Sequence, residues 1–162
     1  MRLPFVMTPF SNLRISTAAV AILLAACNPE ITAPTVEGTV FAPALNVDLA
    51  ASTKTASGMY YRDLQAGGGA LLVSGHTIAV RYTGALPSGV VFDSNTGAAT
   101  PFSFTLGAGQ VIAGFDEGIA GMHVGGSRQL IIPPSLGYGA SAHGAIPGNS
   151  VLVFTVTVVS SS

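Results

Sequence analysis

Charged residues are scarce in this chain. Only 8% of its 162 residues are Asp, Glu, Lys or Arg, whereas about 25% is typical of globular domains. Six basic residues stand against seven acidic ones, and two of the six, Arg2 and Arg14, fall in the first quarter of the chain. A nucleic-acid-binding surface requires clustered Lys and Arg. The composition therefore predicts no nucleic-acid partner.

Cysteine is almost absent, and metal-ligand patterns are missing altogether. The single cysteine, Cys27, excludes an intramolecular disulfide. The three histidines, His76, His123 and His143, are scattered and lack the paired spacing of a metal site. We therefore expect no metal site.

An apolar run occupies residues 15–26. Its length fits the core of a signal peptide, which is about 7–15 residues, and is short of the ~20 residues that span a bilayer. The run ends in Leu24-Ala25-Ala26-Cys27, which resembles a bacterial lipobox. That resemblance implies cleavage before Cys27 and lipidation of its sulfur. The alternative is an ordinary cleaved signal peptide with an incidental cysteine.

Lipidation of Cys27 would anchor the chain, since two or three acyl chains hold a protein firmly to a membrane. Asn28 follows the cysteine, and resemblance to enterobacterial sorting rules then implies the periplasmic side of the outer membrane. Residues 28–57 are rich in Ala, Thr, Pro and Val without a clear period, so we expect a flexible linker there. The expected organisation is a lipoprotein signal peptide (1–26), a lipidated N-terminus with a flexible linker (27–57), and one folded domain (58–162).

From Gly58 onward the chain consists of short alternating runs separated by glycines. Ile78, Val80 and Tyr82 recur at a period of two, which predicts a half-buried strand over 76–82. Similar runs predict further strands over 59–64, 102–106, 128–132 and 151–159.

One segment has a helical period instead. Phe115, Ile119 and Met122 are spaced by four and three residues, and Asp116 lies early, near the positive end of a helix dipole. We expect one short helix over 114–121. Several antiparallel strands with a single helix predict an α+β domain.

The segment 133–149 contains no expected strand or helix. Connections longer than ~12–15 residues are uncommon inside compact domains and are often functional. Tyr138 and Ile146 lie within it, and we expect both side chains to pack against the rest of the domain.

Seven short motifs follow one another between Tyr82 and Phe154. They are Tyr82-Thr83-Gly84, Phe92-Asp93-Ser94, the run from Pro101 to Gly107, the run from Gln110 to Gly118, the run from Met122 to Gly125, Tyr138-Gly139-Ala140, and Ile146-Pro147 followed by the run from Val151 to Phe154. In this order and at this spacing they resemble the FKBP family of peptidyl-prolyl cis/trans isomerases, over roughly residues 57–160.

The resemblance implies an antiparallel sheet of about five strands wrapped around one short helix. It implies isomerisation of prolyl bonds in proline-containing polypeptides, whose proline sits in an apolar pocket between helix and sheet. It also implies binding of macrolide inhibitors such as rapamycin, and no cofactor. We expect a monomer, since no dimerisation segment is visible upstream of the domain.

The resemblance also implies the roles of particular residues. Tyr82, Asp93 and Tyr138 would be catalytic: the Tyr138 hydroxyl and the Ile112 backbone N–H hold substrate carbonyls, and Asp93 orients through Tyr82. The remaining pocket residues would be Phe92, Phe102, Phe104, Val111, Ile112, Phe115, Ile146 and Phe154.

Two positions depart from the family's pattern. Phe115 stands where the family usually has Trp, at the floor of the pocket, so we expect activity with altered ligand affinity. Ala98 stands where well-studied members have an Arg that reaches the pocket Asp, so we expect Asp93 to be less well oriented.

Three functions follow from these observations. The first is an isomerase that assists protein folding in the bacterial cell envelope. The second is an FKBP-fold binding or chaperone module with weak or no turnover, and the departures at Ala98 and Phe115 keep it open. The third is a structural lipoprotein with a degenerate pocket, which the intact set around Tyr82, Asp93 and Tyr138 argues against.

Overall fold

A computed structural model describes residues 33–162 of the chain. The predicted signal peptide, Cys27 and Asn28 lie outside the described residues. Among residues 33–162, no helix has the length and apolar character needed to cross a bilayer.

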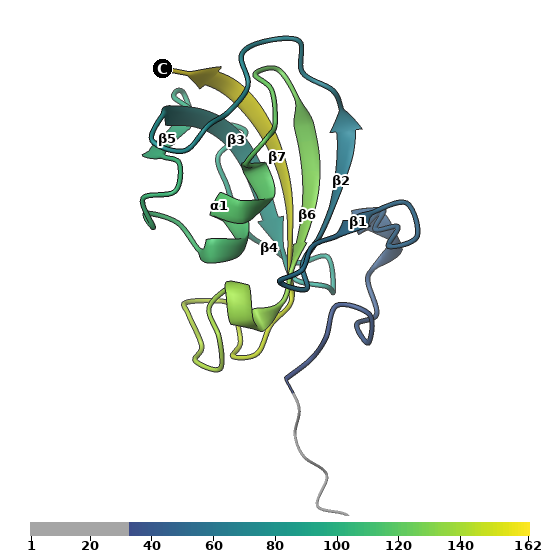
Figure 1. The fold of residues 1–162 in the computed structure, drawn as a ribbon. Coiled ribbons are helices and arrows are strands. Elements are labelled where there is room, and N and C mark those ends of the chain that lie inside the picture. The colour runs from purple at the N-terminus through teal and green to yellow at the C-terminus, as the bar shows by residue number, and fades with distance from the viewer. Residues whose placement is uncertain (1–32) are drawn as a thin grey trace, which may run out of the picture. The chain divides into compact units, whose positions relative to one another are not determined.

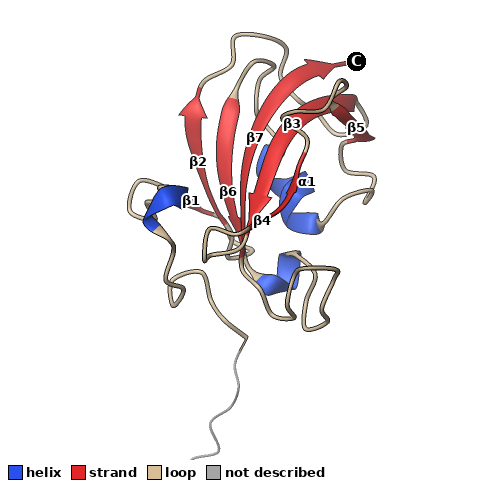
Figure 2. Cartoon of the chain, turned by 180° about the vertical axis from the view of Figure 1, so that it is seen from behind, coloured by secondary structure: helices blue, strands red, loops and turns tan. Residues whose placement is uncertain are grey.

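The described residues form one antiparallel sheet with a short helix on one face (Figures 1 and 2). The strands lie in the order β1-β2-β6-β7-β3-β4, and β5 also pairs with β3. The elements are β1 (Thr53–Lys54), β2 (Tyr60–Gln65), β3 (Thr77–Ala85), β4 (Val91–Ser94), β5 (Phe102–Thr105), α1 (Ala113–Ile119), β6 (Ser127–Ile132) and β7 (Leu152–Ser161), with short 3-10 helices η1 (Pro43–Leu45) and η2 (Pro134–Leu136).

The α+β prediction and all five predicted strands are confirmed. The structure adds two strands, β1 and β4, which have only two and four residues. Asp93 and Ser94 read as turn formers in the sequence, yet they belong to β4. The turn begins one residue later, where the Ala98 N–H donates to the Asn95 carbonyl at 3.0 Å.

The long central strands form because their side chains alternate. In β7, Phe154, Val156 and Val158 are buried on the helix side, and Thr155 and Thr157 between them are exposed. Alternation of this kind fixes the register, since a slip of one residue would turn every apolar side chain outward.

The helix packs closely on the sheet because glycines line its contact face. A Cβ atom at Gly118 would lie 2.7 Å from Leu130 Cδ2, and one at Gly114 would lie 2.4 Å from Ile132 Cγ2. The helix ends at Ile119, slightly earlier than predicted. Met122 lies beyond its end but remains buried.

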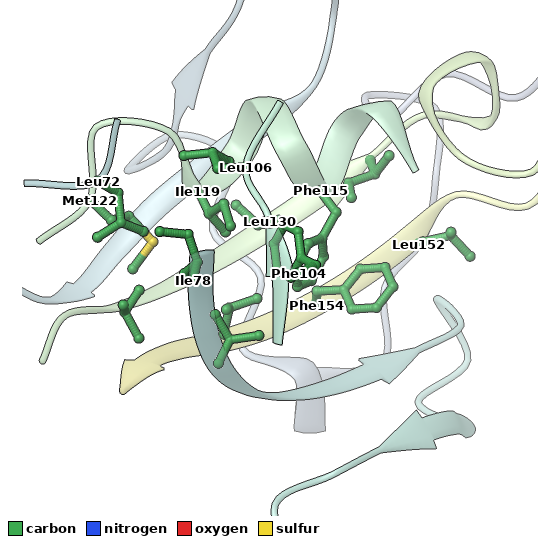
Figure 3. Close-up of a cluster of buried hydrophobic side chains, with 14 of the residues drawn as sticks. Leu72, Ile78, Phe104, Leu106, Phe115, Ile119, Met122, Leu130, Leu152 and Phe154 are labelled. Carbon is green, nitrogen blue, oxygen red and sulfur yellow. The ribbon is translucent and has the colours of Figure 1, made fainter. Parts of the chain in front are cut away.

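The main core fills the space between α1 and the sheet. Figure 3 shows Phe115 extending from α1 toward Phe104 and Phe154. Its buried members are Met59, Leu72, Ile78, Val80, Phe104, Leu106, Phe115, Ile119, Met122, Leu130, Ile132, Ile146, Leu152, Phe154, Val156 and Val158.

A second apolar cluster lies on the opposite face of the sheet, and residues 33–57, here called the strap, cover it. Val36 is 1% exposed and is the strap's most buried side chain. The cluster comprises Val36, Tyr60, Ile131, Val151 and Val153, with Phe41, Leu45, Val47 and Leu49 packed against it.

Polar contacts also hold the strap in place. Arg62 Nη2 donates to the Asn46 carbonyl at 2.6 Å, and Gln129 Nε2 donates to the Leu45 carbonyl at 2.8 Å. The Ala42 N–H donates to the Pro87 carbonyl at 2.8 Å. The prediction of a flexible linker over 28–57 is therefore wrong for residues 33–57, which dock through these hydrogen bonds and through the apolar side chains of the second cluster.

Candidate functional site

A cleft of about 190 Å³ opens between the start of α1 and the sheet. Strands β3, β4, β5 and β7, the start of α1 and the 133–149 segment all contribute to its wall. Its lining residues are Tyr82, Phe92, Asp93, Phe102, Gln110, Val111, Ile112, Phe115, Tyr138 and Phe154.

Aromatic rings in edge-to-face contact build the floor of the cleft. The Phe115 ring centroid lies 5.9 Å from those of Tyr82 and Phe104 and 5.3 Å from that of Phe154. The Phe92 ring lies 5.5 Å from that of Phe154. Pairs at such distances are favourable beyond their buried area, so these rings fix one another and leave a dry apolar surface.

Gly84 on β3 makes this arrangement possible. A Cβ atom there would lie 2.7 Å from ring atoms of both Phe92 and Phe154. Real Cβ atoms do not come so close to other heavy atoms. A side chain at this position would therefore displace at least one of these two rings, both of which line the cleft.

Tyr82 and Asp93 form the polar edge of the cleft. The Tyr82 hydroxyl donates to Asp93 Oδ2 at 2.6 Å. Burial of the ring raises the pKa of Tyr82 well above its usual range, and the hydrogen bond to the Asp93 carboxylate is the second largest cause. Tyr82 thus remains a protonated donor. No Lys or Arg among residues 33–162 forms an ion pair with Asp93.

Two donors at the cleft have no partner within the described residues. Ile112 precedes α1 with extended backbone (φ −60°, ψ 146°), and its N–H donates to no acceptor there. The Tyr138 hydroxyl makes no hydrogen bond either, while the Tyr138 ring stacks on His143 with centroids 4.3 Å apart. Both lie on the lining of the cleft, so both are free to bind a ligand's carbonyl groups.

Residues 69–159 match the family model described as "FKBP-type peptidyl-prolyl cis-trans isomerase". The chain belongs to this family.

The chain is also similar to individual members. It is 53% identical over 87 residues to "FK506-binding protein 2" of Dictyostelium discoideum, covering 53% of this chain and 65% of that protein. It is 50% identical over 109 residues to "FK506-binding protein 3" of Candida albicans, covering 67% of this chain and 25% of that protein. The chain therefore spans only about a quarter of the length of that relative.

Two solved structures resemble the domain. FkpA from Escherichia coli has a TM-score of 0.64 and 35% identity, and the match covers 69% of this chain and 52% of that one. AtFKBP13 has a TM-score of 0.64 and 36% identity, and the match covers 68% of this chain and 98% of that one.

The FKBP cleft contains most of the site residues that the sequence predicts, with two exceptions. Phe104 is buried behind the cleft, where it supports Phe115. Ile146 is also buried and lines an adjoining cavity of about 210 Å³, which shares Phe92, Asp93 and Tyr138 with the cleft. Tyr138 and Ile146 both pack against the main core, which confirms that expectation for the 133–149 segment.

Gln110 is a member of the FKBP cleft that sequence reasoning missed. Its Oε1 atom accepts the Thr105 N–H at 2.7 Å. Asp116 Oδ1 and Oδ2 accept the N–H groups of Gly107 and Gly109 at 3.1 and 3.3 Å. These bonds hold the loop that leads into α1. The sequence feature that could have identified Gln110 is its position directly before the pocket residues Val111 and Ile112.

Proposed function

We propose that this domain catalyses cis/trans isomerisation of Xaa-Pro bonds in polypeptides. The reaction rotates an amide and breaks no bond, so it requires no nucleophile. The uncatalysed barrier is about 18–20 kcal/mol, and relaxation takes ~10–100 s. Acceleration to milliseconds needs a factor of ~10⁴, or about 5.5 kcal/mol.

An apolar cleft supplies a stabilisation of this kind. The planar amide is stabilised by charge separation, which water favours, and the twisted transition state has lost that resonance. A dry site therefore disfavours the planar ground state more than the transition state. The rings of Phe92, Phe115 and Phe154 give the cleft this character.

The observation that carries the proposal is the pair of free donors beside these rings. The Ile112 N–H and the Tyr138 hydroxyl would hold carbonyl groups on the two sides of the prolyl bond, so that rotation is confined to that bond. Asp93 would act through Tyr82 by orienting it, without proton transfer.

Binding of macrolide inhibitors such as rapamycin is part of the same proposal. The names of the relatives, FK506-binding proteins, support it. An apolar cleft with few polar donors is the usual form of a small-molecule site.

The decisive experiment measures cis/trans exchange of an Ala-Leu-Pro-Phe peptide by the chain from residue 33 onward, which lies within one compact unit. We expect acceleration that rapamycin abolishes. Tyr138→Phe is the matched variant, because it removes only the free hydroxyl, and we expect it to weaken turnover. A folded domain that binds rapamycin but gives no acceleration would contradict the proposal.

That last outcome would favour the second function, an FKBP-fold binding or chaperone module. The lack of an ion-pair partner for Asp93 among the described residues favours this function. A binding module would bind proline-containing chains without accelerating their isomerisation. A binding assay with an unfolded protein as ligand would detect this.

We further propose that the chain is a monomeric bacterial lipoprotein. In this proposal residues 1–26 are a signal peptide, Cys27 is lipidated, and the domain faces the periplasm from the outer membrane. The support is the sequence pattern ending at Cys27. Labelled palmitate should attach to the wild-type protein and not to Cys27→Ser. Equal labelling of both, or of neither, would overturn this proposal and leave the isomerase proposal intact.

A further inference from the structure

One edge of β3 has a gap between two partner strands. At that edge β4 pairs with residues 83–85, and β5 pairs with residues 77–80. Residues 95–101 connect the two strands. They leave the edge of β3 around Tyr82, which donates to Asp93, without a strand partner.

The side chain of Asn95 fills this gap. Its Oδ1 accepts the Tyr82 N–H at 2.7 Å, and its Nδ2 donates to the Val80 carbonyl at 3.0 Å. The Asn95 N–H also donates to the Tyr82 carbonyl at 3.1 Å. The half-buried side-chain amide of Asn95 thus makes the hydrogen bonds to Tyr82 and Val80 that a neighbouring strand would otherwise make.

Arg81 holds the same turn from the neighbouring position on β3. Its Nη1 donates to the carbonyls of Asn95 and Ala98, both at 3.0 Å. These two carbonyls mark the start and the end of the turn that follows β4. A charged donor strengthens such bonds, so the turn is tied to β3 at both ends.

We propose that Arg81 and Asn95 are positioning residues that hold the Asp93 carboxylate against the Tyr82 hydroxyl. Asp93 lies two residues before Asn95, and no Lys or Arg among residues 33–162 pairs with it. The resemblance at Ala98, where well-studied family members have an Arg, led us to expect a less well oriented carboxylate. Here Arg81 and Asn95 fix the backbone around the pair instead.

This inference rests on the proposed function, because it assigns the two residues to the orientation of Tyr82 and Asp93 in catalysis. A small misplacement of a group in an active site can cost up to ~100-fold in rate. We expect Arg81→Ala and Asn95→Ala each to lower kcat/KM about tenfold, mostly in kcat. Arg81→Lys should retain most of the activity, because a single nitrogen makes both bonds.

Arg62→Ala is the matched control. Like Arg81, Arg62 lies on a strand and donates to a backbone carbonyl, but that carbonyl belongs to Asn46 of the strap. We expect its kcat/KM to equal that of the wild type. Thermal midpoints identify any variant that fails to fold, and Asn95→Ser then replaces Asn95→Ala.

The deciding measurement is a double-variant cycle with Asp93→Leu. If Arg81 and Asn95 act through Asp93, their removal costs nothing further in the Asp93→Leu background. A full additional loss in that background would overturn the inference, and so would single variants that turn over like the wild type. A wild-type protein without acceleration would instead overturn the proposed function itself.

Discussion

At the scale of single residues, the Tyr82–Asp93 pair forms the polar edge of an aromatic cleft. Replacing Asp93 by Leu removes a hydrogen bond to a charged group, which contributes about 1.5–3 kcal/mol. We expect kcat/KM to fall roughly 10–100-fold. The same hydrogen bond contributes to folding, so the free energy of unfolding should fall by up to about 3 kcal/mol, and by less than that because Asp93 is exposed.

Peptide exchange kinetics and urea unfolding on the same preparation test this prediction. Asp93→Asn is the control, because it keeps an acceptor for the Tyr82 hydroxyl while removing the charge, and it should lose less activity. Unchanged turnover in a folded Asp93→Leu protein would remove Asp93 from the mechanism.

Gly84 is the residue that sets the width of the cleft. In Gly84→Ala, the new Cβ atom would lie 2.7 Å from ring atoms of Phe92 and Phe154, so at least one of these lining rings must move. We expect rapamycin affinity to fall at least tenfold, measured by calorimetry. Overpacking should destabilise the fold by about 1–3 kcal/mol. Undiminished affinity would show that the rings relax away from the ligand.

Sequence reasoning performed unevenly at this scale. The aromatic residues and Tyr82, Asp93 and Tyr138 were found through ordered motifs. Gln110, Arg81 and Asn95 were missed as site residues because each acts by a side-chain bond to backbone. Hydrogen bonds of this kind leave no periodic pattern in the sequence. They depend on which loop the fold brings next to the side chain.

At the scale of elements, Arg128 joins β2, β6 and the end of α1. Its Nε donates to Asp63 Oδ1 at 2.6 Å, its Nη1 donates to the Gly118 carbonyl at 2.9 Å, and its guanidinium lies 4.3 Å from the Tyr61 ring centroid. The side chain is 9% exposed. Arg128→Ala removes these hydrogen bonds and leaves the Asp63 carboxylate in solvent. We expect it to destabilise the domain by about 1.5–3 kcal/mol, measured by urea unfolding.

Arg128→Lys is the sharper variant, because it keeps the charge but not the planar fork that reaches both partners. It should recover less than half of the loss. Asp63→Asn should cost less than Arg128→Ala, since the Asp63 side chain is 54% exposed. A fully stable Arg128→Lys protein would show that charge alone matters here.

The strap has its own acid-sensitive contact. Glu37 accepts hydrogen bonds from Lys54 and Tyr60. The bond from Lys54 is the largest cause that lowers the pKa of Glu37 from 4.5 to about 2. A carboxyl with a lowered folded pKa stabilises the docked strap above pH 4.5, and this contribution is lost as the pH falls toward 2.

Hydrogen exchange of strap amides between pH 5 and pH 2.5, corrected for intrinsic rates, measures this loss. Glu37→Gln should show weak protection at pH 5 and little further pH dependence. Added salt should weaken protection in the wild type at pH 5, because the ion pair is exposed. A strap equally protected at both pH values would show that the ionised Glu37 carboxylate contributes nothing to its docking.

Strand length explains which strands the sequence predicts. A long strand contains enough side chains to show the alternation of apolar and polar residues, and a short strand does not. β3 and β7 have nine and ten residues, and their alternation is unmistakable. β4 has four residues and ends in turn-forming Asp93 and Ser94. The strap alternates only at Leu45, Val47 and Leu49, and its docking surface lies on strands distant in the sequence.

At the scale of the whole described domain, the sheet is apolar on its helix face and on part of the other face, and each apolar area has its own cover. The helix covers one, and the strap covers Ile131, Val151 and Val153 on the other. A chain that begins at residue 50 would expose this second cluster and lose the buried Val36. Burial of one such side chain contributes about 1.5–3 kcal/mol. The partly buried Phe41, Leu45, Val47 and Leu49 are lost with Val36, and we count these four together as about one further buried side chain. We therefore expect a loss of about 3–6 kcal/mol relative to the chain from residue 33.

Urea unfolding of the two chains measures this difference, and a chain that begins at residue 36 is the matched control, since it retains the strap from Val36 onward. No strap residue lines the cleft. At a temperature where both chains are folded, kcat/KM should therefore be equal. Equal stability of the two chains would mean that the second cluster contributes nothing to folding. Equal activity with unequal stability would show that the strap completes the second face of the sheet, while the cleft depends on the helix face.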